Sequence, residues 1–116
     1  PTFMMDAAKV ALECEDSVRE FNREYLKRRE MMMEGLSSLP GIRVPEPEGA
    51  FYVFADVTGT GMTDIEFADG ALEAGVQLIP ASLITGGEGF VRVSYAADEE
   101  DILEGLRRLR SWLLQE

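Results

Sequence analysis

Histidine is absent from this chain of 116 residues, and cysteine occurs once, at Cys14. Without histidine, Ser–His and Cys–His nucleophile pairs, the commonest general base and the usual zinc sites are all excluded, so we expect no metal site. A single cysteine excludes an internal disulfide and fits a reducing, cytoplasmic setting. Because Cys14 falls on the apolar face of an expected helix, we interpret it as a buried structural residue and not as a nucleophile.

Basic residues are also scarce, since 11 Lys and Arg face 22 Asp and Glu and the formal net charge is −11. Nucleic acids and anionic membranes are recognised through basic surfaces, so we expect neither as a partner. No apolar run approaches the roughly 20 residues of a membrane span, and no signal-peptide pattern opens the chain. Its length and its 46% of hydrophobic residues predict one globular domain over residues 1–116. The start at Pro1 indicates a piece of a longer chain or a processed product.

Apolar residues recur every three or four positions from Thr2 to about Ser38, which predicts one long amphipathic helix. The stripe consists of Phe3, Ala7, Val10, Cys14, Val18, Phe21, Tyr25, Met32, Leu36 and Leu39. A helix of about 35 residues is long for a globular domain, so we expect a bend near Arg28-Arg29. Leu39-Pro40-Gly41 is expected to end the helix.

Four short runs after this helix have the composition of strands. They are Ile42-Arg43-Val44, Ala50–Ala55, Val76–Ile79 and Gly89–Ala96. Between the last two, residues 81–87 are expected to form an irregular loop.

Two further helices separate and follow these runs. The first begins at a capping box, Thr63 to Glu66, and ends at Gly75. Its inward residues are expected to be Phe67, Ala68, Ala71 and Leu72. The second is capped by Asp98, and its buried stripe is expected to be Ile102, Leu106, Leu109 and Leu113. The order of elements predicts an α+β fold, with a small mixed or antiparallel sheet of three to four strands packed by helices.

The last expected strand places an arginine among apolar residues. Two sets of residues alternate along this strand: Val91, Val93 and Tyr95 in one, and Phe90, Arg92 and Ser94 in the other. Arg92 therefore shares a face of the strand with Phe90 and Ser94. We therefore expect its guanidinium at a partly apolar, concave surface, where its planar fork can bind a carboxylate through two parallel hydrogen bonds. Taken alone, the strand favours the simpler interpretation of a solvent-facing arginine on a half-buried sheet.

The order of the surrounding motifs favours the carboxylate-binding interpretation of Arg92 over the solvent-facing one. The motifs are Arg28-Arg29-Glu30, Gly35–Ile42, Pro47–Phe54, Val76–Pro80 and Val91–Ala96. In this order and spacing they resemble the C-terminal small domain of class I and II pyridoxal-phosphate aminotransferases, the aspartate aminotransferase superfamily of fold type I. The segment from Pro80 to Thr85 departs from the family pattern because it lacks the usual glycines and phenylalanine.

The resemblance implies a role for the chain in a larger transferase of amino-acid metabolism. In the family, the arginine matched by Arg92 binds the α-carboxylate of the substrate. The stretch Gly49-Ala50-Phe51-Tyr52 runs near the substrate-facing side, so Gly49, Phe51 and Tyr52 are weaker substrate-binding candidates. The resemblance also implies an amino acid and a 2-oxo acid as substrates, a large domain in the same chain, and a homodimer.

The family's catalytic lysine, which holds pyridoxal 5'-phosphate, belongs to the large domain. The two lysines of this chain, Lys9 and Lys27, stand in unrelated contexts and are interpreted as surface residues. We therefore expect a domain fragment that binds no cofactor and is inactive alone.

Two other interpretations stay open at the level of sequence. One is a free-standing amino-acid-binding regulatory module of ACT-like or ferredoxin-like build, since a small sheet backed by helices fits that architecture too. The other is an interaction domain that presents its first helix to a partner. The long first helix and the two strand motifs favour the aminotransferase interpretation over the regulatory module.

Overall fold

Three antiparallel strands form the sheet of this protein in a computed structural model that describes residues 1–115. The elements, in chain order, are α1 (Thr2–Ala11), α2 (Glu15–Ser37), β1 (Tyr52–Asp56), the 3-10 turn η1 (Thr58–Thr60), α3 (Asp64–Glu73), β2 (Ile79–Pro80), α4 (Ser82–Thr85), β3 (Phe90–Ser94) and α5 (Glu99–Leu114). The strands lie in the order β1-β3-β2, so β3 is the central strand. The predicted α+β fold with a small sheet of three strands is confirmed.

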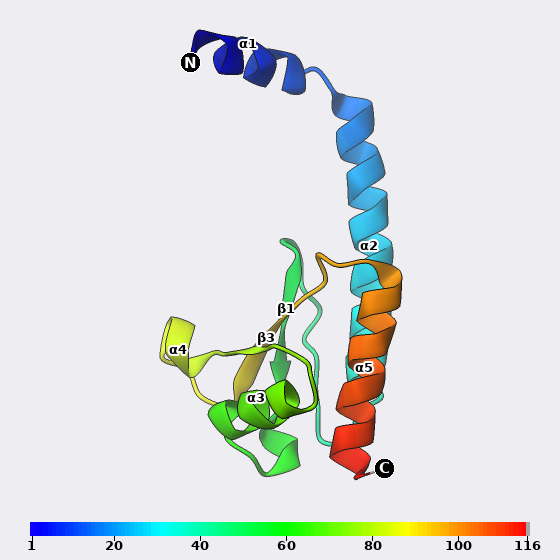
Figure 1. Ribbon diagram of the computed structural model, residues 1–116, viewed down its shortest axis with the longest axis vertical. Helices are drawn as coiled ribbons and strands as arrows, with labels where there is room; N and C mark the ends of the chain where they lie inside the picture. The colour runs from blue at the N-terminus through cyan, green and yellow to red at the C-terminus, as the bar shows by residue number, and fades with distance from the viewer. Residues whose placement is uncertain (116) are drawn as a thin grey trace.

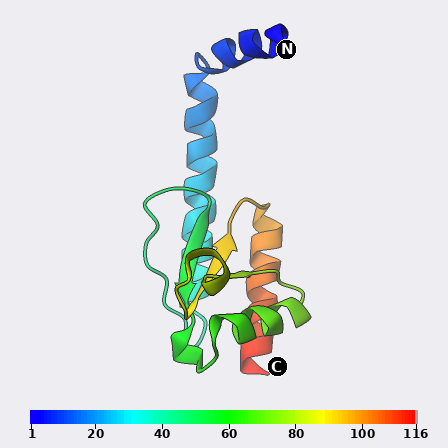
Figure 2. The same cartoon turned by 90° about the vertical axis from the view of Figure 1, so that its left-hand side faces the viewer.

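One face of the sheet forms the core together with the helices. Val53 and Ala55 of β1 and Val91 and Val93 of β3 are buried, and they alternate with residues that are at most half-buried. The helices contribute Met32, Leu36, Phe67, Ala68, Ala71, Ile102 and Leu109 to the same hydrophobic cluster. Figure 2 shows α2 and α5 behind the sheet, with the short helix α4 in front of it. The face opposite α2 and α5 is called here the open face.

The first helical segment leaves this core and extends away from it (Figure 1). Every residue from 1 to 24 is exposed, so we call residues 1–24 the arm and residues 25–115 the body. The helix breaks between α1 and α2, at residues 12–14, and not near Arg28-Arg29 as predicted. Both arginines are partly buried in the part of α2 that packs against α5 and β1, and α2 continues through them without a break. At the break, Glu15 and Asp16 favour a new helix start because acidic residues stabilise an N-terminus.

The arm also corrects the expectation for the cysteine. Cys14 is exposed in the connection between α1 and α2, so it is not a buried structural residue. The helical stripe on which that prediction depended exists, but nothing in residues 1–115 packs against it at this position.

Two predicted strands are shorter than expected. Arg43 forms only an isolated bridge with Asp56, because Pro45 follows almost at once and has no N–H to donate to a ladder. The strand expected over residues 76–79 is reduced to Ile79–Pro80, and the first long strand starts at Tyr52 instead of Ala50. The loop expected over residues 81–87 contains the single-turn helix α4.

The predicted ends of the remaining helices are largely confirmed. At the start of α3 the Thr63 hydroxyl accepts from the Glu66 amide, and the Glu66 side chain accepts from the Thr63 amide. Asp98 occupies the N-cap of α5, but its carboxylate makes no capping hydrogen bond and lies 3.9 Å from Arg28. Leu72 is 59% exposed, so its predicted inward position is wrong.

Of the four residues predicted to form the buried stripe of α5, two are fully buried. Ile102 and Leu109 are buried, whereas Leu106 and Leu113 are partly buried and pack against the margin of the core. Among residues 1–115, the helices lack the combination of length and apolar character that a membrane-spanning segment needs.

Candidate functional site

Arg92 lies at the centre of the open face. On β3 it pairs with Phe54 of β1 on one side and with Ile79 of β2 on the other. All three side chains are partly buried. The prediction that Arg92 stands among apolar neighbours is therefore confirmed, and the central strand of the sheet fixes its backbone on both edges.

The guanidinium of Arg92 stacks on an aromatic ring. Its Cζ atom lies 5.2 Å from the ring centroid of Tyr52, which is its diagonal neighbour across the β1–β3 ladder. This distance is within the range of a cation–π interaction. Tyr52 in turn makes edge-on contacts with Phe51 at 5.3 Å and Phe54 at 6.2 Å between ring centroids. Of the predicted site residues, Tyr52 thus lies against Arg92, and Phe51 contacts Tyr52.

The arginines of the body differ in how their charge is balanced. Arg28 and Arg29, which are also partly buried, lie 3.9 Å and 3.5 Å from the carboxylates of Asp98 and Glu46. Arg92 has no ion pair and no hydrogen bond from its guanidinium within residues 1–115. In a chain with twice as many acidic as basic residues, a partly buried arginine without a carboxylate is conspicuous. The site has an unmet capacity to bind one.

The loop before β1 is held by two residues that the sequence did not single out as site residues. The Tyr95 hydroxyl donates to the carbonyl of Ala50 at 2.8 Å, and Arg29 Nη1 donates to the carbonyl of Pro47 at 3.0 Å. Ala50 itself has a left-handed φ of 64°, which costs a non-glycine residue energy. Burial raises the pKa of Tyr95, so its hydroxyl keeps its proton and remains a donor. Both anchors lie in motifs that carried the family resemblance, and that placement was the available signal.

Gly49 is exposed in this loop, and a Cβ atom there would meet nothing within 4 Å among the described residues. Its φ is not in the left-handed region that favours glycine. The body of the chain therefore imposes no need for glycine at this position.

Two buried aspartates shape the ends of the strands near the open face. Asp56, at the end of β1, accepts hydrogen bonds from the Thr58 hydroxyl and amide at 2.6 Å and 3.0 Å. The hydrogen bond from the Thr58 side chain is the main cause that lowers the pKa of Asp56. Asp64 accepts from the Ser82 amide at 2.9 Å, and hydrogen bonding from Ser82 lowers the pKa of Asp64. Asp64 thereby ties α3 to the segment Pro80–Thr85, which departs from the family pattern.

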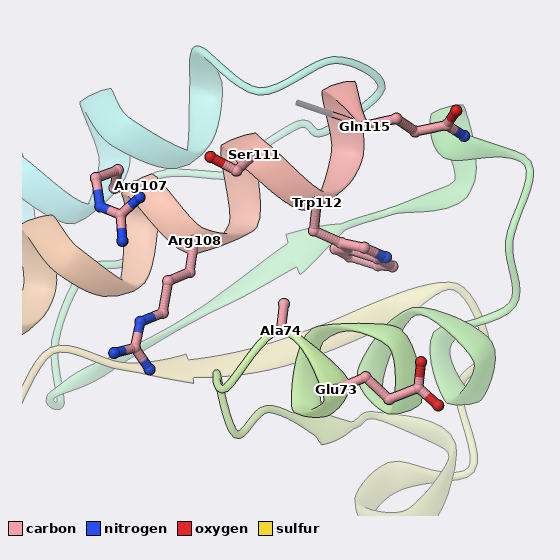
Figure 3. Close-up of a pocket in the computed structure, with 7 residues that line it drawn as sticks. All are labelled: Glu73, Ala74, Arg107, Arg108, Ser111, Trp112 and Gln115. Atoms are coloured by element: carbon pink, nitrogen blue, oxygen red, sulfur yellow. The ribbon is translucent and has the colours of Figure 1, made fainter.

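A groove of about 500 Å³ lies on another side of the molecule, between α3 and α5 (Figure 3). Trp112 and two arginines of α5, Arg107 and Arg108, line it opposite Glu73. Both arginines are already paired with the carboxylate of Glu104. Arg92 does not line this groove, so the groove is separate from the open face.

A family model now decides what this chain is related to. The model described as aminotransferase class I and II matches residues 1–109. The chain belongs to this aminotransferase family.

Individual relatives agree with the family model. The chain is 41% identical to an aspartate aminotransferase of Pyrococcus horikoshii over 117 residues, covering 97% of this chain and 30% of that protein. It is 39% identical to a probable N-acetyl-LL-diaminopimelate aminotransferase of Bacillus subtilis, covering 86% of this chain and 26% of that protein. The structure of an aromatic aminotransferase from Pyrococcus horikoshii superposes with a TM-score of 0.81 at 34% identity, covering 86% of this chain and 27% of that one. The chain thus spans less than a third of the length of these aminotransferases.

The cofactor implied by the aminotransferase family, pyridoxal 5'-phosphate, needs a lysine with a neutral amine to hold it. Lys9 is on the exposed arm, 3.7 Å from Asp6. Lys27 lies 2.6 Å from Glu99, and the hydrogen bond to Glu99 raises the pKa of Lys27, which favours the charged form. The sequence contains only these two lysines. Their surroundings do not fit the cofactor.

Proposed function

We propose that this chain is the substrate-carboxylate-binding domain of a pyridoxal-phosphate-dependent aminotransferase, an enzyme that transfers an amino group between an amino acid and a 2-oxo acid. The observation that carries the proposal is Arg92, a partly buried arginine on the central strand that has no carboxylate partner within residues 1–115. Membership of the aminotransferase family supports the reaction class.

In the proposed reaction, Arg92 binds the α-carboxylate through the two N–H groups at the edge of its guanidinium. The amino-acid donor and the 2-oxo acid acceptor both retain this carboxylate, so the same contact orients the substrate in both halves of the exchange. The aromatic side chains around Arg92 limit the access of water, which strengthens a charge-assisted hydrogen bond. Because Tyr52 lies against Arg92 and Phe51 contacts Tyr52, we assign both side chains to the carboxylate site. Gly49, where an added Cβ would meet nothing within 4 Å among the described residues, is the weaker candidate.

The cofactor chemistry is assigned to another part of the protein. Neither lysine of these 116 residues fits a Schiff base. We therefore propose that the catalytic lysine is supplied by a large domain that belongs to the same full-length polypeptide. The chain as given is therefore expected to be inactive alone. The exposed apolar stripe of the arm supports this assignment, because an unpartnered stripe of this kind is typical of a surface that another domain covers.

Two features of the setting remain part of the proposal. The exposed free thiol of Cys14 fits a reducing, cytoplasmic location. A homodimer is expected from the family resemblance, and measurement of molar mass in solution tests it.

A carboxylate titration tests the proposed role of Arg92. We expect succinate to shift the side-chain Nε–Hε signal of Arg92 in a spectrum of the ¹⁵N-labelled chain, with a dissociation constant of about 1 mM or weaker because half of the site lies outside the chain. Arg92→Lys keeps the charge but removes the planar fork, so it should weaken binding. In Arg92→Lys the Arg92 side-chain signal is absent, so the backbone amide signals next to position 92 are followed instead. If succinate shifts these amide signals equally in the wild-type chain and in Arg92→Lys, the role of Arg92 is refuted.

The same titration separates the main alternative. A free-standing amino-acid-binding module contains its whole site, so it should bind one amino acid with a dissociation constant of about 100 μM or tighter. Weak binding of carboxylates of every kind favours the aminotransferase domain, whereas tight and selective binding of one amino acid favours the regulatory module.

A second experiment tests the absence of cofactor chemistry in this chain. Pyridoxal 5'-phosphate is added, borohydride is used to trap any Schiff base, and the modified residue is located by mass spectrometry. We expect no saturable adduct at Lys9 or Lys27. A stoichiometric adduct at one lysine would show that the chain binds the cofactor itself.

A further inference from the structure

The ring of Tyr52 lies against the guanidinium of Arg92 and is itself held from two sides. Phe51 contacts it edge-on with an interplanar angle of 79°, and Phe54 contacts it edge-on with an interplanar angle of 90°. Edge-to-face contacts of this kind are favourable because the positive edge of one ring meets the negative face of another. The three rings form a unit, called here the aromatic trio, and Arg92 stacks on its middle member.

The backbone that carries the aromatic trio is fixed to the strand that carries Arg92. The Tyr95 amide donates to the carbonyl of Phe51 at 2.9 Å, and the Tyr95 hydroxyl donates to the carbonyl of Ala50 at 2.8 Å. Tyr95 follows Arg92 by three residues and is 2% exposed. The position of the Tyr52 ring relative to Arg92 is therefore determined from both strands.

The contact made by Tyr52 uses its ring and not its hydroxyl. Within residues 1–115 the phenolic oxygen of Tyr52 has no hydrogen-bond partner. Tyr52 is also only partly buried and does not belong to the hydrophobic cluster of the core. Its packing thus contributes to the open face more than to the stability of the body.

We propose that Tyr52 is a positioning residue that holds the guanidinium of Arg92 in the orientation needed to bind a carboxylate. A free arginine side chain samples many rotamers, and binding must restrict them. The contact with the Tyr52 ring restricts these rotamers. Because the guanidinium makes no hydrogen bond within residues 1–115, its N–H groups remain available for two parallel hydrogen bonds. This inference rests on the proposed function, since it requires that Arg92 binds a carboxylate.

The experiment uses the ¹⁵N-labelled chain and the Nε–Hε signal of Arg92, identified by its loss in Arg92→Lys. In the ligand-free chain, the Tyr52 ring should displace this proton signal through its ring current. Tyr52→Phe should retain the displacement and the affinity for succinate, whereas Tyr52→Leu should lose the displacement and weaken succinate binding about three- to tenfold. Rescue by phenylalanine is a result that a role of the hydroxyl would not give.

The chain offers a matched control. Arg28 lies 5.8 Å from the ring centroid of Tyr25 on α2, which is a second arginine–tyrosine stack away from the open face. Arg28→Leu removes this second stack while keeping the Tyr25 ring that contacts Tyr95 at 6.2 Å, and it should leave both the Arg92 signal and the succinate affinity unchanged. If Tyr52→Leu fails to fold by circular dichroism, Tyr52→Thr replaces it, because a β-branched residue suits a strand.

The outcomes separate this inference from the proposed function. If succinate shifts the Arg92 signal of the wild-type chain but Tyr52→Leu binds with unchanged affinity, the positioning role is refuted and the proposed function stands. If succinate leaves the wild-type Arg92 signal unmoved, the proposed function fails and the positioning role fails with it.

Discussion

The arm and the body of this chain carry apolar stripes of the same kind, but only the body buries its stripe. Phe21 of the arm is 63% exposed, whereas Phe67 of the body is 1% exposed. Both lie on amphipathic helices with the same spacing of apolar residues. The comparison shows that helical periodicity reveals the existence of a packed face, while the partner that covers the face has to be found in three dimensions.

The largest expected difference between the two regions is in the cost of removing a phenylalanine ring. Phe67→Ala should lower the free energy of unfolding by about 3–5 kcal/mol, because Phe67 packs edge-on against Trp112 inside the core. Phe21→Ala should change it by no more than about 0.5 kcal/mol. Urea denaturation followed by circular dichroism measures both values, and equal losses would show that the arm packs on a surface in solution.

Two helical glycines of the body provide the next largest contrast. A Cβ atom at Gly70 would overlap the indole ring of Trp112, so Gly70→Ala should destabilise the chain by about 1–3 kcal/mol. Gly105 lies within α5 and has nothing within 4 Å of an added Cβ among the described residues. Gly105→Ala should therefore stabilise the chain by up to about 1 kcal/mol. Thermal unfolding gives the sign of each change, and two changes of the same sign would contradict this packing of α3 on α5.

The buried carboxylate of Asp56 should make the stability of the body depend on pH. Its pKa is lowered in the folded chain, mainly by the Thr58 hydroxyl, from about 3.9 in an unfolded chain. The stabilisation is thus fully present above about pH 5 and is lost as the pH falls through the lowered pKa. Asp56→Asn should cost roughly 1 kcal/mol at pH 7 and have little effect at the acidic end.

The control for this pH dependence is Asp69→Asn, since Asp69 is exposed and accepts no hydrogen bond within residues 1–115. Its stability curve should follow that of the wild-type chain from pH 7 down to the acidic end. Parallel curves for wild type and Asp56→Asn would disprove the assignment to Asp56.

The smallest expected effect lies in the arm. Cys14→Ser should change the free energy of unfolding by less than about 0.5 kcal/mol, because the thiol is exposed between α1 and α2. The native thiol should also react with a disulfide reagent as fast as it does in urea. Protection of the thiol in the native chain would mean that the arm is covered.

The sequence predicted the parts of the fold that local chemistry determines. The capping box at Thr63, the left-handed glycine after α3 and the alternation around Arg92 depend on neighbouring residues, and each was found. The failures concern packing between distant segments. Cys14 and Leu72 lie on apolar stripes but are exposed and have no packing partner within residues 1–115, and the helix break lies where the body no longer contacts the first helical segment.

The candidate site was predicted only in part for the same reason. Arg92 was identified from the alternation of β3 and from the family resemblance. Its stack on Tyr52 depends on the register of β1 against β3, which pairs Phe54 with Arg92. Register is set by turns and by cross-strand packing, and a single sequence does not display it.

The alternation of β3 has a consequence for how such a protein can change. Val91 and Val93 of β3 face the core, while Phe90, Arg92 and Ser94 face outwards. The residues that stabilise the fold and those assigned to the proposed carboxylate site therefore occupy alternate positions of one strand. Substitutions at positions 90 and 94 can then alter the surroundings of Arg92 while the protein still folds. A library randomised at these two positions should consist mostly of folded clones, which makes the open face a tractable starting point for changing the proposed carboxylate binding by selection.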